Sequence, residues 1–271
     1  MPLQRKQNQL MQYLQLFLFI LIVLTVQYQL FMVAFAMVIG FIIYMAIVSN
    51  QKRVFVWVNI AYLIGYLFFL YGDRIIDDLS YPVNTLMILS RCLLLIPIFF
   101  MVYVIRKFSE NINDYWNRPN WQAQIGFPFV WGGFHFVSVK VFLLVAIFVN
   151  LVSFIPFISF AKLSLAPPFL FFVFLFSIVN GFLEELLWRG ILLTRMVDLA
   201  GEKPALFFSS IAFGLSHLAF GYSWAVCLGF AVGGFFYAGI TIRSGSILPA
   251  IIWHIVFNIF MILSGLIPYV G

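Results

Sequence analysis

The chain has 271 residues, of which 64% are hydrophobic and only 9% are charged, whereas roughly 25% of residues are charged in soluble domains. A soluble fold of this size has too small an interior to keep so much apolar surface away from water. The net charge of +6 is dispersed between apolar segments and forms no cluster that would bind nucleic acid. Both cysteines lie in apolar runs, which argues against a disulfide framework or a thiolate metal cluster. The composition therefore predicts an integral membrane protein embedded in the lipid bilayer.

Apolar runs of about the 20 residues that one bilayer crossing needs recur along the chain. They are continuous and do not alternate apolar with polar residues, so we expect helices rather than the strands of a barrel. The predicted fold is an all-α, polytopic transmembrane bundle of about nine spans, or of eight if the short seventh run merges with a neighbour. The runs are 9–26, 30–49, 54–72, 83–105, 141–160, 167–194, 204–220, 223–242 and 247–267.

The distribution of Lys and Arg predicts the orientation, because cytoplasmic loops carry an excess of positive charge. With nine spans and the N-terminus inside, the outside segments hold only Arg74 and Lys162, and Arg91 and Arg189 fall within spans. We therefore predict N-in and C-out, with the first run as an uncleaved anchor. The inside segments then hold Arg5, Lys6, Lys52, Arg53, Arg106, Lys107, Arg118, Lys140, Arg195, Lys203 and Arg243.

The longest break between apolar runs, 106–140, is rich in Trp and Tyr, which prefer the membrane interface. We interpret it as a cytoplasmic connector that lies partly on the membrane. It separates an N-terminal four-helix region, 1–105, from a C-terminal five-helix catalytic core, 141–271. No internal repeat joins the two halves, which argues against an inverted-repeat transporter.

The sixth run contains two adjacent carboxylates and an arginine. Glu185 and Arg189 are four residues apart, so they share a helix face and can form an ion pair. Glu184 is turned by about 100° from Glu185 and cannot use Arg189 equally well. A carboxylate held away from water can act as a general acid or base. A structural ion pair would explain Glu185 and Arg189, but it leaves Glu184 without a role.

Two later runs carry histidines. His217 follows Ser216 in the seventh run, and His254 and Asn258 lie on one helix face in the ninth. Each of these taken alone is more often a packing or hydrogen-bonding residue. Counted from the flanking charges at 1.5 Å per residue, however, Glu184, His217 and His254 reach depths of roughly 15 to 20 Å. Their shared depth favours a common site.

The pattern Glu-Glu-x-x-x-Arg, Phe-x-x-x-His and His-x-x-x-Asn, on successive membrane helices, resembles the CPBP family. This family contains the type II CAAX prenyl endopeptidases and the bacteriocin-processing membrane proteases. The resemblance extends over the flanks of each motif, such as 244–258 (SGSILPAIIWHIVFN), and covers the chain from about residue 141 onward. It implies an intramembrane protease whose substrate is a peptide or protein, prenylated or membrane-anchored.

The resemblance also implies roles for the motif residues. Glu184 would activate a water molecule with help from His217, and His254 and Asn258 would stabilise the oxyanion. Glu185 and Arg189 would orient the site. Water activation and oxyanion stabilisation are what peptide hydrolysis needs, and a serine nucleophile is not required.

Arg91, in the fourth run, is expected to snorkel or to cap a polar contact. We expect no cofactor and do not favour zinc, because there is no His-Glu-x-x-His pair and Arg189 lies close to Glu185. Three helices can nevertheless converge into a zinc site that a sequence does not reveal. The alternatives to a glutamic-type protease are an ion-coupled carrier with a Glu–His proton relay, and a non-catalytic immunity or scaffold protein.

Overall fold

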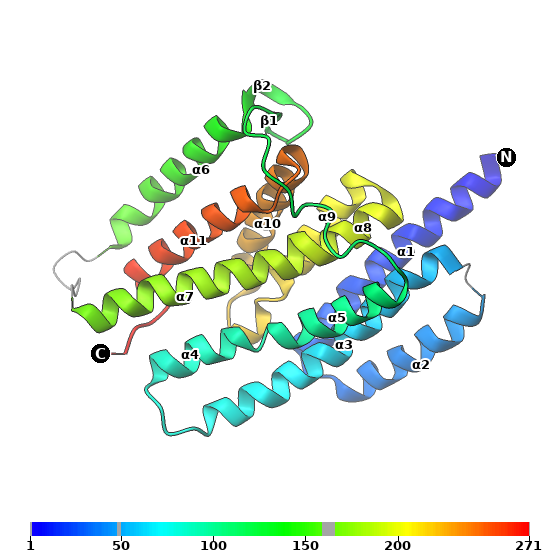
Figure 1. The fold of residues 1–271 in the computed structure, drawn as a ribbon, viewed down its shortest axis with the longest axis horizontal. Coiled ribbons are helices and arrows are strands. Elements are labelled where there is room, and N and C mark those ends of the chain that lie inside the picture. Colours follow the sequence, from blue (N-terminus) through cyan, green and yellow to red (C-terminus); the bar gives the residue numbers. More distant parts are fainter. Residues whose placement is uncertain (1, 48–49, 159–165, 271) are drawn as a thin grey trace. The chain divides into compact units, whose positions relative to one another are not determined.

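The computed structural model describes residues 2–47, 50–158 and 166–270. Each of the nine predicted runs contains a helix, which confirms a helical membrane bundle. Among the described residues, six helices are long and apolar enough to cross a membrane. The number of spans and the orientation stay predictions, and Lys162 lies outside the described residues. The helices in Figure 1 are α1 Pro2–Gln27, α2 Phe31–Ile47, α3 Asn50–Asp77, α4 Val83–Cys92, α5 Leu95–Lys107, α6 Val139–Phe154, α7 Pro167–Glu185, α8 Leu193–Ala200, α9 Glu202–Leu215, α10 Trp224–Ser244 and α11 Leu248–Leu263.

The chain forms two compact units, each assembled from several separate segments. The first unit holds the chain up to Leu70 together with Ile96–Asp114 and Trp188–Gly239. The second holds Tyr71–Leu95, Tyr115–Leu187 and Ile240–Gly271. The division into three regions along the chain stays a prediction.

Aromatic side chains form the interior of the first unit. Phe19 of α1 lies edge-on to Tyr62 of α3, with ring centroids 5.0 Å apart. Trp188 meets both of these rings and also Phe213 of α9. Such edge-to-face pairs are favourable beyond their apolar area, and here they join α1, α3 and α9 around the segment that follows α7.

Helix α7 is the centre of the second unit, where it packs against α4 and α11, while α11 also packs against α6. α7 and α11 run antiparallel (Figure 1). Phe169, Phe172 and Phe176 of α7 form a buried cluster with Ile262 of α11. The cluster fixes the part of α7 that precedes its two glutamates.

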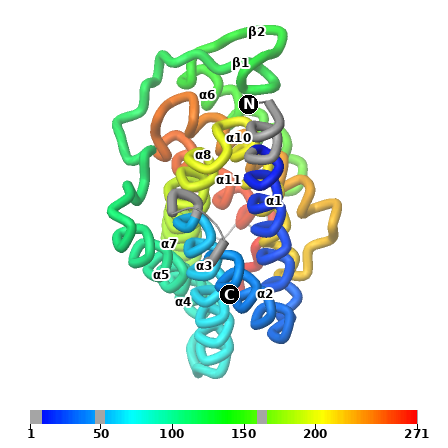
Figure 2. Tube along the Cα trace, turned by 90° about the vertical axis from the view of Figure 1, so that its right-hand side faces the viewer, coloured from blue at the N-terminus to red at the C-terminus, as the bar shows by residue number. Residues whose placement is uncertain are grey.

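The connector contains a feature that the sequence did not predict, a two-stranded antiparallel hairpin of β1 Gln124–Pro128 and β2 Gly133–Ser138. The hairpin leads directly into α6 (Figure 2). Before the hairpin, the backbone of the connector bonds to the turn between α10 and α11: Ile247 N–H donates to the Tyr115 carbonyl over 3.0 Å. The Ser246 hydroxyl donates to the Asn117 carbonyl over 2.6 Å. The connector therefore holds the start of α11.

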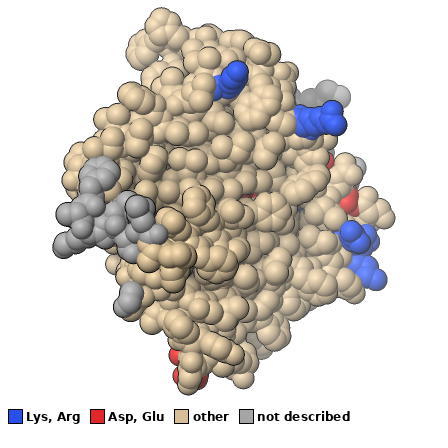
Figure 3. Space-filling view, turned by 60° about the vertical axis from the view of Figure 1, so that its left-hand side comes forward, with Lys and Arg blue, Asp and Glu red and all other residues tan. Residues whose placement is uncertain are grey.

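The surface is suited to lipid. On the face in Figure 3, residues other than Lys, Arg, Asp and Glu cover almost the whole area. Large apolar side chains point outward, such as Phe148 of α6 and Phe171 of α7, which are 64% and 65% exposed. Apolar side chains exposed to this extent need an apolar solvent. The protein is therefore an integral, multi-pass membrane protein.

Candidate active site

The two glutamates lie at the end of α7, where the helix changes its geometry. α7 ends at Glu185, and Leu186–Leu192 continues as a π-helix, whose hydrogen bonds join residues five apart instead of four. Such π segments occur often at functional sites. The sequence carries no sign of this change, and the predicted pairing of Glu185 with Arg189 presumes α-helical spacing throughout.

Two glycines allow α11 to pack closely against α7. Gly245 has a φ of +67°, a left-handed conformation that closes the tight turn before α11. Gly181 lies so close to α11 that a Cβ atom there would meet the Ile255 backbone nitrogen at 3.1 Å. This close approach of the two helices brings the side chain of His254 to the glutamates.

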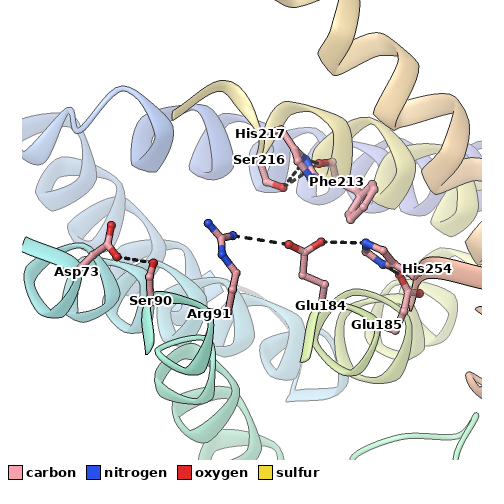
Figure 4. A network of polar contacts seen from close by, with 9 residues as sticks. All are labelled: Asp73, Ser90, Arg91, Glu184, Glu185, Phe213, Ser216, His217 and His254. Carbon is pink, nitrogen blue, oxygen red and sulfur yellow. Dashed lines mark hydrogen bonds and ion pairs between the residues drawn. The ribbon is translucent and has the colours of Figure 1, made fainter. Parts of the chain in front are cut away.

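A network of polar contacts joins these helices (Figure 4). His254 Nδ1 lies 2.7 Å from Glu185 Oε1, a hydrogen bond within the second unit. His254 Nε2 lies 3.7 Å from Glu184 Oε2. Glu184, Glu185 and His254 are 7%, 0% and 4% exposed, so the cluster is held away from solvent. The structure thus brings His254 together with the two glutamates.

Arg91 is a site residue that the sequence interpretation missed. Of the two expectations for Arg91, the polar contact is observed: its Nη1, on α4, lies 3.9 Å from Glu184 Oε1, on α7 (Figure 4). Next to it, the Ser90 hydroxyl donates to Asp73 Oδ1 over 2.5 Å and ties α4 to the end of α3. The signal was present, because an arginine in a membrane span needs a partner and Glu184 had none on its own helix.

The carboxylates of Glu184 and Glu185 differ in their hydrogen bonding. Glu185 Oε1 accepts the short bond from His254, whereas Glu184 is within 4 Å of two positively charged or chargeable groups without a hydrogen bond to either. Glu184 Oε2 is buried and has no hydrogen-bond partner among the described residues. One turn after His254, Asn258 is 3% exposed, and its Nδ2 donates to no described residue. An acceptor and a donor thus stay unused next to His254.

The other two predicted site residues belong to the first unit. Arg189 donates from Nη2 to the Gly234 carbonyl over 3.2 Å and stacks over Phe213, with its Cζ 4.2 Å from the ring centroid. Cation–π contacts of this kind are stronger when the cation is desolvated, and Arg189 is 2% exposed. The ion pair of Arg189 with Glu185 stays a prediction.

His217 follows the end of α9, in a turn rather than inside the helix as predicted. Its Nδ1 lies 2.8 Å from the Phe213 carbonyl, an acceptor, so Nδ1 carries a proton and donates it. In the neutral ring Nε2 is then an acceptor. Ser216 donates its hydroxyl to the same carbonyl over 2.7 Å. His217 therefore has the tautomer that a general base needs.

The arrangement of these side chains also bears on metal binding. Within 2–47, 50–158 and 166–270, no group of three or more His, Cys, Asp or Glu side chains has an arrangement that would hold a metal ion. The contacts of His254 explain part of this result, because its Nδ1 is engaged with Glu185. Whether the active protein contains zinc stays a prediction.

The comparisons with known proteins concern the same part of the chain. The family model described as type II CAAX prenyl endopeptidase Rce1-like matches residues 166–260. No curated protein and no solved structure matches the chain. The matched segment begins at α7, ends inside α11 and contains all six site residues predicted from the sequence. Over this segment the chain is similar to the Rce1-like family of type II CAAX prenyl endopeptidases, and this similarity supports an intramembrane protease of the CAAX type.

Proposed function

We propose that the protein is a glutamic-type endopeptidase, which hydrolyses a peptide bond within or beside the membrane by means of a water molecule activated by Glu184. The observation that carries this proposal is that the buried carboxylate of Glu184 accepts no hydrogen bond from the described residues, whereas that of Glu185 accepts one from His254. A carboxylate of this kind has an acceptor position ready for a water proton. Glu185 is less suited to the task, since its Oε1 already accepts the bond from His254.

In the proposed reaction, Glu184 accepts a proton from water while the water oxygen forms a bond to the scissile carbonyl carbon. The carbonyl oxygen becomes an oxyanion, and the Asn258 amide and a His254 N–H donate to it. Glu184 then returns the proton to the leaving nitrogen as the C–N bond breaks. Donors fixed in advance around an oxyanion are among the strongest catalytic contributions. A role for His217 in taking the water proton stays an expectation from the family resemblance, because His217 belongs to the first unit.

The charges in the second unit support the role of His254. Glu185 holds the proton on Nδ1, so a second proton on Nε2 would make the ring a cation that donates on both sides. Arg91, 3.9 Å from Glu184, and a cationic His254, 2.7 Å from Glu185, would together balance the charges of the two carboxylates. A buried group of charges is tolerated when it is paired in this way.

The substrate is proposed to be a peptide or protein anchored near the bilayer, with a prenylated C-terminus as the first candidate because of the family match. We further propose the N-in, C-out orientation from the Lys and Arg distribution, which would admit substrate from the cytoplasmic leaflet. The match to a peptidase family favours this function over the ion-coupled carrier and over a non-catalytic scaffold.

The test compares Glu184→Gln with Glu185→Gln in the purified, full-length protein, using a quenched farnesylated peptide that ends in a Cys-a-a-X motif (a, aliphatic). Loss of the general base should lower kcat for Glu184→Gln by about 10³-fold, within the usual range for general acid–base catalysis. It should lose less thermal stability than Glu185→Gln, because Glu184 makes no hydrogen bond to a described residue and only its charge near Arg91 is lost. Glu185→Gln should be less active and also less stable, since it weakens the bond to His254. Normal turnover in Glu184→Gln would refute the mechanism.

A further inference from the structure

Three polar side chains follow one another along a single face of α7. Ser177, Asn180 and Glu184 are spaced by three and four residues, so they point the same way. They are 0%, 6% and 7% exposed. Ser177 Oγ, Asn180 Oδ1 and Glu184 Oε2 are all buried without a hydrogen-bond partner among the residues that the structure describes. Asn258 Nδ2, from the neighbouring α11, is in the same state.

Several buried hydroxyls elsewhere in the chain are satisfied locally, whereas Thr241 Oγ1 and Tyr62 OH, like Ser177 Oγ, have no hydrogen-bond partner among the described residues. Ser210, Thr194 and Thr25 each donate to the carbonyl four residues earlier in the chain, over 2.6, 2.6 and 2.8 Å. Ser177 is equally buried in a helix, yet it makes no such bond to a described carbonyl. Ser177 differs from the other hydroxyls without a partner in its position, on the face of α7 that also carries Asn180 and Glu184.

The chemistry of the four atoms limits what that partner can be. Glu184 Oε2 and Asn180 Oδ1 are both acceptors and cannot bond to each other, Asn258 Nδ2 is a donor, and a hydroxyl is both. A water molecule has two donors and two acceptors, so it can serve all three kinds of group. Side chains four residues apart on a helix have Cβ atoms about 5–6 Å apart, which two hydrogen bonds through one water can span. Buried water commonly makes about three such bonds.

We propose that Ser177, Asn180 and Asn258 form, with Glu184, a buried water-binding site between α7 and α11, which holds the water that the protease consumes. A water that donates to both Glu184 Oε2 and Asn180 Oδ1 keeps a lone pair for the scissile carbonyl carbon. Ser177, about 10 Å further along α7, holds a second water that replaces the first after each turnover. The use of this water rests on the proposed hydrolytic function, whereas its binding does not.

The main chain of a bound substrate is the other group that offers both donors and acceptors. About three residues of extended peptide would span the distance from Glu184 to Ser177. The burial of the site favours water, because Ser177 is 0% exposed and lies one helical turn from Gly181, where α7 and α11 approach closely. A peptide would have to separate α7 from α11, but a water molecule would not.

The test compares Asn180→Leu and Ser177→Ala with a matched control, Asn59→Leu, in the full-length protein. Asn59 of α3 is an equally buried amide, 0% exposed and without a hydrogen-bond partner among the described residues, and it lies in the first unit. The first readout is X-ray hydroxyl-radical footprinting, which labels side chains beside bound water. In the wild type, Phe176 and Leu183 should be labelled although they are only 4% and 7% exposed. Labelling of both residues should fall several-fold in the two test variants and stay unchanged in Asn59→Leu.

The second readout is the kinetics of the farnesylated peptide and of versions that are one to three residues longer or shorter. Loss of one hydrogen bond to the reacting water should lower kcat of Asn180→Leu by about tenfold, with KM unchanged at every peptide length. Absence of label at Phe176 and Leu183 in the wild type would overturn the proposal. The proposal would also be overturned if the KM of Asn180→Leu rose with peptide length while its kcat stayed at the wild-type value. That result would mean that the site binds the substrate main chain. If Glu184→Gln is inactive but Asn180→Leu keeps full kcat, the water site fails and the proposed function stands.

Discussion

The replacement Gly181→Ala tests whether the close contact between α7 and α11 holds the active site in place. A Cβ atom at this position would lie 2.9 Å from Ile255 Cγ1 and 3.1 Å from the Ile255 nitrogen. Carbon atoms in contact normally stay about 3.5–4.0 Å apart, so the two helices must separate by roughly half an ångström to one ångström. The side chain of Ile255 can turn away, but its backbone nitrogen cannot.

That separation acts directly on the hydrogen bond between His254 and Glu185. The bond is 2.7 Å long, and an added half to one ångström takes it to or beyond the limit of about 3.2 Å for a good hydrogen bond. Two buried groups then lose their partner, which costs about 1–3 kcal/mol. A shift of this size at a catalytic group can lower the rate about 10²-fold. We therefore expect Gly181→Ala to lower both the unfolding free energy and kcat/KM.

The assay is thermal unfolding in detergent together with cleavage of the farnesylated peptide. Gly233→Ala is the matched control, because Gly233 also lies in a membrane helix and a Cβ atom added there would meet no neighbouring atom within 4 Å. It should be neutral or slightly stabilising. Ile255→Ala removes Cγ1, the atom nearest to the added Cβ. In a double-mutant cycle it should partly restore the stability and activity that Gly181→Ala loses. Full activity and stability of Gly181→Ala would refute the role assigned to this helix contact.

Two further predictions concern the charges of the site. Arg91→Gln removes the cation 3.9 Å from Glu184 and should lower kcat/KM about tenfold to 10²-fold, whereas Arg91→Lys should recover part of that loss; equal activity of the two variants would contradict the pairing. The active protein should contain no stoichiometric zinc by elemental analysis and should stay active after prolonged chelation, because Glu184, His254 and Asn258 supply the base and the donors themselves. Activity that is lost on chelation and restored by added zinc would show that prediction to be wrong.

Most of the membrane fold could be predicted from the sequence, because apolar run length is a strong signal. Each predicted run contains a helix. The observed helix boundaries differ from the predicted ones by several residues. The β1–β2 hairpin was missed, since Gln124–Pro128 and Gly133–Ser138 carry no clear alternation between apolar and polar residues. The bonds from the connector to the turn before α11 were missed too, because contacts between backbone groups leave no residue pattern.

The site was predictable to the extent that its residues occur in spaced pairs on helices. Glu184 and His254 were predicted to lie at a common depth, and in the structure His254 lies 3.7 Å from Glu184 and 2.7 Å from its neighbour Glu185. The sequence predicted a polar contact as one option for Arg91 but not its partner, because Glu184 is 93 positions further along the chain and helix spacing gives no register between residues on different helices. The π-helix Leu186–Leu192 was not foreseen either, since propensities distinguish π from α geometry poorly. Long-range pairing and unusual helix geometry are tertiary properties.

The unpaired polar groups around Glu184 indicate that this region is adapted to reaction rather than to stability. A buried polar atom that stays without a partner costs about 1–3 kcal/mol, and ordering the proposed water beside such atoms costs up to about 2 kcal/mol. An apolar side chain of similar shape avoids both costs. A leucine at Asn180 would pack with the apolar residues around α7 and remove the penalty. Hence Asn180→Leu should unfold at the same temperature as the wild type or at a higher one, while its turnover falls. A gain in stability paired with a loss of kcat is what a reaction site predicts, and a packing residue would show the opposite.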